Sequence, residues 1–422
     1  MEEIERPATR GAQRLPVGVF VLALGVFVIG TGEFVLAGLI PLLAADFGLG
    51  YGAAGQVVTV FAVTCALAAP TMTTVTAKWP RQRVLVTAGI VYLFGAVATA
   101  LAPTFGLLLA GQVVAAVGTG LFIPNASVTA AALVSKDVGG RAIAAVITGF
   151  TLAVAFGAPG GTAIGALYGW RVTMWLAAGV AVLGVIGVAL FIPRSTGVAD
   201  TGGFRQRLEP LRDRRVVALL ATTLVAFTAV YIPYTYIGAI FSPATGGDGV
   251  RLGLLMTALG VAGAIGNLVA GRLVDRYGGS SVVLFALLWL ILSFAVIAFT
   301  HTTYGWSLTA IGFYGIAAFA ITTPQQHRLI ARDPAGASVV LSLNQAVLYL
   351  AIGVSGVVGA AGIEVVGAGS VVWIAAALAV VAIALSMLGT PWNPRRDTPP
   401  VSPDADTSTA ESLRSSSGQV RS

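Results

Sequence analysis

The sequence predicts an all-α protein that crosses a membrane twelve times. Only 10% of its 422 residues are charged, whereas soluble domains carry about 25% charged residues. The mean hydropathy is +0.90, and twelve successive windows of about 20 apolar residues are each long enough to span the hydrocarbon core. Helices are expected because a spanning backbone must satisfy its own hydrogen bonds. The alternating pattern of a membrane β-barrel is absent from the sequence.

The expected spans fall into two groups of six, separated by the longest polar connection. They cover residues 15–44, 54–77, 84–102, 104–133, 142–167, 173–193, 216–243, 252–273, 281–300, 304–326, 337–361 and 366–389. The expected parts of the chain are an N-terminal segment (1–14), a six-helix bundle (15–193), a central loop (194–215), a second six-helix bundle (216–390) and a disordered tail (391–422). The first span is too long for the apolar region of a signal peptide, so we expect it to be retained.

Basic residues predict the orientation of the chain. If the N-terminus is cytoplasmic, 22 of the 24 Lys and Arg lie in cytoplasmic segments, including Arg328 and Arg332 after the tenth span. Only Arg171 and Arg251 fall outside. We therefore expect both termini in the cytoplasm and a multi-pass protein of a bacterial inner membrane. The net charge of +7 follows from this distribution, which argues against nucleic-acid binding.

Glu33 is the only ionisable side chain between Leu15 and Ala45. An ionised acid in the middle of a span costs roughly 2.5–3.5 kcal/mol on insertion scales, and such residues usually mark transport pathways. A surrounding of low dielectric favours the neutral, protonated form. Glu33 is therefore a candidate proton carrier, and the alternative is a structural carboxyl that is protonated and bonded to a neighbouring helix.

Other polar side chains inside the spans are candidates for a substrate cavity. They are Gln112, Asn125, Tyr231, Tyr234, Asn267 and Asn344. The tyrosines equally suit a belt at the membrane surface; the asparagines equally suit hydrogen bonds between helices. Gln112 equally suits a packing contact. Glu33 and Gln112 lie about 16 and 12 Å from the outer ends of their spans. Because these depths are similar, a hydrogen bond between the two side chains is a further hypothesis.

The sequence indicates no metal site, cofactor or catalytic centre. Neither His301 nor His327 has a partner at metal-ligand spacing, and the single Cys65 excludes an internal disulfide. No phosphate-binding loop of the Gly-x-x-x-x-Gly-Lys-[Ser/Thr] type occurs. We expect that the protein is not an enzyme, and that a transport role would use an ion gradient or facilitated diffusion.

A run of glycines around one proline characterises the fifth span. Its members are Gly149, Gly157, Pro159, Gly160, Gly161 and Gly165. Glycines permit close contact between helices, and a proline permits a bend. The run resembles the antiporter motif of the twelve-span drug:proton antiporters of the major facilitator superfamily. Gly32-Glu33-Phe34 and Asn344-Gln345 resemble the arabinose-efflux and chloramphenicol-resistance branch of that family. The resemblance covers about residues 15–390 and implies the major facilitator fold of two six-helix bundles.

Two loops resemble the gating loops of the same family, one in each half of the chain. The matching residues are Lys78, Arg81 and Arg83 in the first copy and Gly271, Asp275, Arg276 and Gly278 in the second. The first copy departs from the family pattern, because Thr73 and Ala77 replace a Gly and an Asp. Gln112 also stands where the family usually has an Arg that assists proton release.

The resemblance implies a proton-coupled secondary transporter. Its cargo would be a small amphipathic or apolar compound, such as an amphenicol antibiotic, exported by alternating access. Glu33 would carry the proton. One alternative is an exporter of a sugar or nucleoside, and another is a non-transporting membrane sensor. We expect a small-molecule substrate, protons and the lipid bilayer as partners of a monomer, without a cofactor.

Overall fold

The computed structural model describes residues 15–135, 138–194, 209–334 and 336–389. In this part of the chain helices are the only regular elements, and twelve are long and apolar enough to cross a membrane. The expected number of spans is therefore confirmed. The expected N-terminal segment, the tail and most of the central loop lie outside the described residues.

The spans are arranged as two groups of six along the chain. The first group consists of α1 (Val17–Phe47), α2 (Tyr51–Val75), α3 (Arg81–Ala100), α4 (Phe105–Ala132), α5 (Gly139–Leu152) with its π-helical continuation η2 (Ala153–Gly157) and α6 (Ala158–Tyr168), and α7 (Trp170–Phe191). The second consists of η3 (Glu209–Arg212), α9 (Arg214–Thr235), α10 (Ile237–Ile240), α11 (Ser242–Thr245), α12 (Gly249–Tyr277), α13 (Gly279–Thr300), α14 (Tyr304–Phe319), α15 (Thr322–Arg332), α16 (Ala337–Val366) and α17 (Val371–Gly389).

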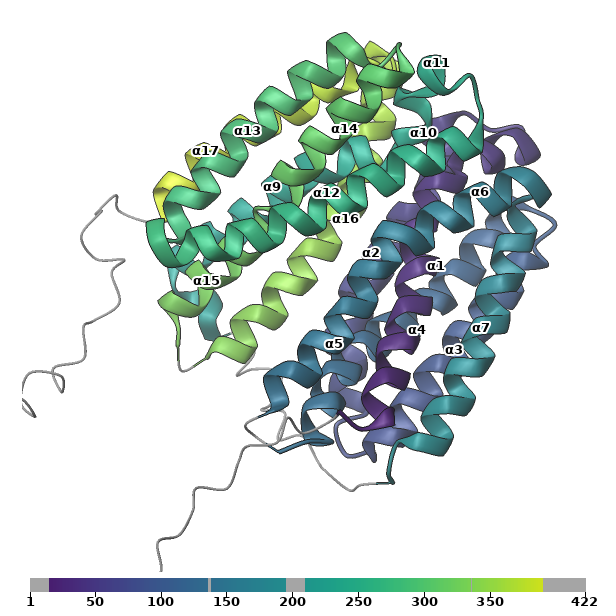
Figure 1. Ribbon diagram of the computed structural model, residues 1–422, viewed down its shortest axis with the longest axis vertical. Coiled ribbons are helices and arrows are strands. Elements are labelled where there is room, and N and C mark those ends of the chain that lie inside the picture. The colour runs from purple at the N-terminus through teal and green to yellow at the C-terminus, as the bar shows by residue number, and fades with distance from the viewer. Residues whose placement is uncertain (1–14, 136–137, 195–208, 335, 390–422) are drawn as a thin grey trace, which may run out of the picture.

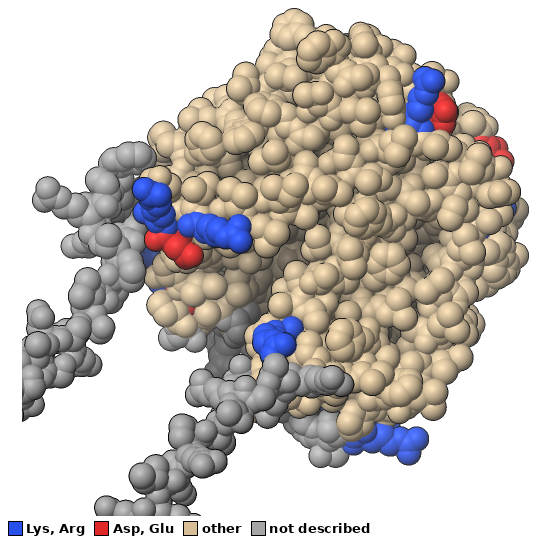
Figure 2. Space-filling model, viewed as in Figure 1, with Lys and Arg blue, Asp and Glu red and all other residues tan. Residues whose placement is uncertain are grey.

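The two halves lie side by side and diverge toward one face of the protein (Figure 1). We call this the basic face, because Lys78, Arg81 and Arg83 lie there between α2 and α3. The far face is the opposite one, where α11 lies. Figure 2 shows the surface hollowed between the halves toward the basic face, and a broad uncharged band between the charged ends. Such a band is what a lipid-facing surface requires.

Small residues bring the halves together near the far face. A Cβ added to Gly253 of α12 would lie 2.9 Å from the carbonyl oxygen of Pro159 in α6. At Gly260 it would lie 2.5 Å from the Cα of Ala155 in η2. A second contact between the halves joins α16 to α2, where Gly356 packs against Thr59. Glycines permit this approach of backbone to backbone, so the far face is closed while the basic face is open.

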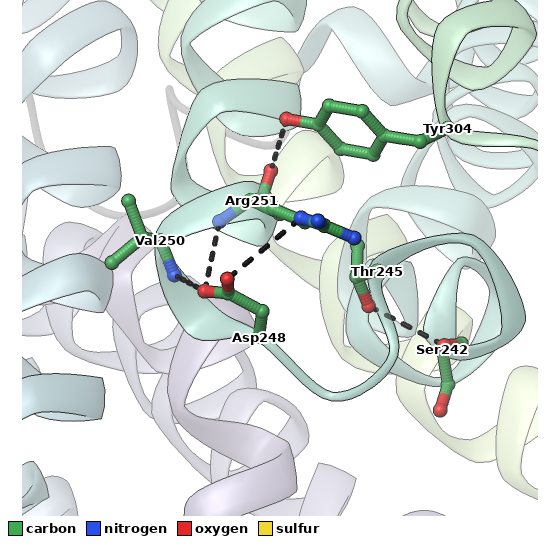
Figure 3. Close-up of polar contacts among 6 residues, drawn as sticks. All are labelled: Ser242, Thr245, Asp248, Val250, Arg251 and Tyr304. Atoms are coloured by element: carbon green, nitrogen blue, oxygen red, sulfur yellow. Dashed lines mark hydrogen bonds and ion pairs between the residues drawn. The ribbon is translucent and has the colours of Figure 1, made fainter.

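The start of α12 is held by its own capping residue (Figure 3). One oxygen of Asp248 accepts hydrogen bonds from the backbone N–H groups of Val250 at 2.7 Å and Arg251 at 3.2 Å. The hydroxyl of Tyr304 donates to the carbonyl of Arg251 at 3.2 Å, which joins α14 to this turn. Asp248 satisfies donors that every helix start leaves open. The cap thus fixes where α12 begins.

Most spans begin and end within a few residues of the sequence-based boundaries, and two of the differences affect the site. The seventh span is not one helix over 216–243, because α9 ends at Thr235 and the short α10 and α11 follow. Pro233 lies two residues before this end and has no N–H to donate, which weakens the last turn. The tenth span continues as α15 to Arg332 rather than ending at residue 326. This extension takes Arg328 into the helical bundle.

Candidate functional site

Glu33 lies in the middle of α1, in a narrow pocket between the two halves. Its side chain is only 8% exposed. The pocket is walled by α1 and α2 from the first half and by α9 and α16 from the second. Aromatic and aliphatic side chains form most of its lining, among them Phe34, Phe61, Tyr231, Tyr234, Val58 and Ile352. One carboxyl group therefore stands in an otherwise apolar and aromatic pocket.

The partner of the Glu33 carboxyl comes from the other half of the protein. The hydroxyl of Tyr349, in α16, donates to Oε2 of Glu33 at 3.3 Å. In the described part of the chain Glu33 forms no ion pair with a Lys, Arg or His. Tyr349 carries little signal in the sequence beyond being a tyrosine inside an apolar span, where a buried hydroxyl needs a partner.

Tyr231 and Tyr234 lie in the pocket rather than at a membrane surface. Both are almost fully buried, with 7% and 5% of their surfaces exposed. The Tyr234 hydroxyl donates to the carbonyl oxygen of Phe34 at 3.3 Å, which makes a second hydrogen bond between the halves. The Phe34 ring packs edge-on against Tyr234 and against Phe150 of α5, at 5.8 and 5.4 Å between centroids. An aromatic chain thus connects α5, α1 and α9 beside Glu33.

Gln112 does not reach Glu33, so the hydrogen bond considered from their similar depth is not formed. Its amide donates to the hydroxyl of Thr99 in α3 at 3.2 Å. The rise of a helix predicts the depth of a residue but not the direction of its side chain, and this face of α4 packs on α3.

The three asparagines also make contacts away from the pocket beside Glu33. Asn125 donates to the carbonyl of Leu121 one turn earlier at 2.7 Å. Asn267 and Asn344 accept hydrogen bonds from Thr323 and Thr223, each at 2.8 Å. The last two bonds connect different helices of the second half, which is the structural role open to a polar residue in a span.

The glycine run of the fifth span packs mainly against α1. Added Cβ atoms would meet Ala23 at Gly149, Thr31 at Gly157, Val35 at Gly161 and Leu39 at Gly165. Gly160 differs, because nothing lies within 4 Å of the Cβ position. The chain adopts a π-helical turn at Ala153–Gly157 within this run, and such turns are frequent at functional sites. The run therefore presses α5, η2 and α6 onto the helix that carries Glu33.

The two loops that resemble gating loops lie at the basic face. Lys78 and Arg83 are exposed, and the Arg81 guanidinium donates to the carbonyl of Val128 at 3.0 Å. In the second copy Asp275 and Arg276 are exposed, and within the described residues Asp275 forms no ion pair.

Glycines give this second loop its shape. Gly271 is half-buried, and Gly278 joins α12 to α13 with a φ of 77°. This backbone conformation favours glycine over other residues.

Comparison with known proteins decides the family. The sequence profile of the Major Facilitator Superfamily matches residues 22–337 and, overlapping with these, residues 219–419. The chain belongs to the major facilitator superfamily. This confirms the resemblance seen in the sequence, and with it a membrane transporter of two six-helix halves.

Relatives of this major facilitator protein include drug-resistance proteins. It is 32% identical over 268 residues to the chloramphenicol resistance protein of Streptomyces lividans, covering 62% of this chain and 68% of that one. It is 28% identical over 334 residues to the inner membrane transport protein YdhP of Escherichia coli (strain K12), covering 79% and 84%. A crystal structure of the nucleoside transporter NupG superimposes with a TM-score of 0.72 at 13% identity, covering 89% of this chain and 100% of that one. The transporter is a multi-pass protein of the bacterial inner membrane.

This facilitator also buries a cation, Arg328, that the sequence places beyond the end of the tenth span. Arg328 of α15 is only 6% exposed. Its guanidinium donates to the Gln325 side chain at 3.1 Å and to the hydroxyl and carbonyl oxygens of Ser386 in α17, both at 2.9 Å. Gln325 in turn donates to Thr223, which donates to Asn344. Arg328 therefore lies in the helical bundle rather than in a loop, because α15 continues past the apolar window that predicted the tenth span.

Proposed function

We propose that this protein exports a small amphipathic or apolar compound, such as an amphenicol antibiotic, in exchange for protons. One observation carries the proposal: Glu33, the one buried carboxyl among the described residues, lies in an apolar pocket that both halves of the transporter form. The similarity to a chloramphenicol resistance protein supports the class of cargo. The basic face is the cytoplasmic one, because Lys and Arg gather there.

The chemistry of the pocket suits a cargo that is mostly apolar with a few polar groups. The rings of Phe34, Phe61, Tyr231 and Tyr234 offer flat apolar surface, and the tyrosine hydroxyls and the Glu33 carboxyl offer hydrogen bonds. A few polar groups in an apolar pocket are typical of small-molecule sites. A highly charged cargo would need more ionic partners than this lining provides.

The protein would export its cargo if the proton and the cargo occupied the pocket beside Glu33 alternately. When the basic face is open, cargo enters from the cytoplasm and Glu33 releases its proton to that side. When the halves rock and the far face opens, cargo leaves and Glu33 takes up a proton from outside. Each ligand shifts the protein toward the state that it binds better, so the proton gradient drives the cargo outward.

Two other features play supporting roles in this cycle. The glycine run from Gly149 to Gly165 holds the fifth span against α1 and limits leakage around Glu33. The loops at the basic face, with Arg81 in one copy and Asp275 and Arg276 in the other, act as gates between the halves. Gln112, Asn125, Asn267 and Asn344 shape the helices around the cavity rather than the pocket itself.

The first test compares two Glu→Gln variants in a bacterium that lacks its own drug pumps. Glu33→Gln removes the proposed proton carrier, and Glu364→Gln is the matched control because Glu364 is exposed at the end of α16. We expect wild type and Glu364→Gln to raise tolerance to chloramphenicol and to release protons from everted vesicles when the drug is added. Glu33→Gln should lose drug-induced proton release and active export at equal expression.

Two results would overturn the proposal. If Glu33→Gln still exports chloramphenicol against a gradient as well as wild type does, Glu33 is not the coupling acid. If wild type gives no tolerance to any amphipathic compound of a panel, and instead exchanges sugars or nucleosides for protons in vesicles, the class of cargo is wrong.

A further inference from the structure

The hydrogen bond between Tyr349 and Glu33 joins the two halves at the candidate proton site. We propose that Tyr349 is a positioning residue for the proton on Glu33, stabilising the ionised carboxylate while the basic face is open and so favouring release of the proton to that side. The inference rests on the proposed function of Glu33 and assigns it a partner. Tyr349 itself makes no contact with the cargo in this role.

The hydrogen bond from Tyr349 favours one protonation state of Glu33 over the other. A phenol that donates to an ionised carboxylate makes a charge-assisted hydrogen bond, which is stronger than one to a neutral carboxyl group. The Tyr349 side chain is only 4% exposed. In such a pocket water does not compete well for the carboxylate, so the one donor that reaches it has a large influence. Tyr349 therefore stabilises the form of Glu33 that has released its proton.

Other titratable groups face Glu33 without bonding to its carboxyl group. Cys65 of α2, Tyr92 of α3 and Tyr231 and Tyr234 of α9 lie close enough to interact with it electrostatically. The Cys65 thiol donates to the carbonyl of Ala116 at 3.4 Å.

The hydroxyls of two of these tyrosines have other neighbours. That of Tyr92 packs against Gly32, and that of Tyr234 donates to a backbone carbonyl. Among the described residues, Tyr349 alone donates to the carboxyl of Glu33.

The bond also depends on how the halves are arranged. Glu33 belongs to α1 of the first half and Tyr349 to α16 of the second, and α16 packs on α2 through Gly353 and Gly356 toward the far face. A rocking motion that opens the far face moves α16 away from the first half and lengthens the bond. Ionised Glu33 therefore favours the arrangement with the far face closed, and protonated Glu33 gains less from it.

A titration without any cargo tests the inference. The probe is the infrared carbonyl band of a protonated carboxyl group in purified protein, assigned to Glu33 by its absence from Glu33→Gln. Tyr349→Phe removes the donor and keeps the ring. Tyr234→Phe is the matched control, because it removes a hydroxyl bond of the same length across the same gap, to the backbone of Phe34. We expect the midpoint of the band to move up by about one pH unit in Tyr349→Phe, and to stay at the wild-type value in Tyr234→Phe.

The outcomes separate this inference from the proposed function. Equal midpoints in wild type and Tyr349→Phe, or a band that titrates in neither, would overturn the role of Tyr349. So would equal shifts in both tyrosine variants, because the effect would then come from the packing of the halves. Loss of proton-coupled export in Glu33→Gln is measured separately, with chloramphenicol, and is unaffected by any of these results.

Discussion

Glu33 and Arg328 are both buried ionisable residues, but they are held in opposite ways. Glu33 accepts one long hydrogen bond, at 3.3 Å, from a helix of the other half. Arg328 donates three hydrogen bonds of 2.9–3.1 Å to Gln325 and Ser386, in α15 and α17 of its own half. A group bonded across the gap changes its surroundings when the halves move, whereas one bonded within a bundle keeps its partners. The arrangement of Glu33 suits a site that binds and releases a proton, and that of Arg328 suits a residue that stabilises the second bundle.

The largest effect that this comparison predicts is on the stability of the second half. Arg328→Met should lower the free energy of unfolding by about 2–4 kcal/mol, because Gln325 and Ser386 lose hydrogen bonds from a charged donor. Arg332→Met is the matched control, since Arg332 lies one turn later in α15 and its exposed ion pair with Asp213 should contribute less than about 1 kcal/mol. Unfolding of purified protein in micelles of rising SDS content measures both. If the two variants unfold alike, Arg328 does not brace the bundle.

A smaller effect is expected where the halves meet. Gly260→Ala would place a methyl group 2.5 Å from the Cα of Ala155, and such overpacking shifts the balance against the closed far face by about 1–3 kcal/mol. Gly160→Ala is the control, because nothing lies within 4 Å of its Cβ position. If the far face opens in Gly260→Ala, Tyr349 should also move away from Glu33, whereas Arg328 should keep its hydrogen-bond partners.

Spin labels can report this opening directly. Gly106 and Gly305 lie at the far-face ends of α4 and α14, in open space, so cysteines introduced there are free to carry labels. The native Cys65 is buried and should not react. We expect the distance between the labels to lengthen in Gly260→Ala and to stay unchanged in Gly160→Ala. An unchanged distribution in both variants would show that the glycine contact does not hold the far face closed.

The sequence predicts the spans and the isolation of Glu33 well, because both depend on local composition. It fails for contacts between distant helices. Tyr349 is 316 residues away from Glu33 along the chain, and no local pattern pairs them. The depth of Gln112 follows from helical rise, but the direction of its side chain toward Thr99 depends on how α4 packs on α3. Arg328 lies beyond an apolar window and so looks like a loop residue, although α15 carries it into the bundle.

The smallest effect on the free energy of unfolding is expected for Asp213, a charged residue that is neither buried nor placed between the two halves. The Arg215 backbone N–H, with help from the Arg332 guanidinium, holds the pKa of Asp213 below its usual range. Asp213→Asn keeps an oxygen at the helix cap but loses the exposed ion pair, so the free energy of unfolding should change by at most about 0.5 kcal/mol at neutral pH.

The pH dependence of Asp213 has a definite sign. A lowered pKa in the folded state means that ionised Asp213 stabilises the protein above the pKa of the unfolded chain, about 3.9, and that this contribution is lost as the pH falls through the lower folded value. Wild type should therefore lose its small advantage over Asp213→Asn on acidification below about pH 4. Unfolding in SDS micelles at a series of pH values measures it. A large loss in Asp213→Asn at neutral pH would contradict the comparison, because an exposed charge would then brace the second half as strongly as the buried Arg328.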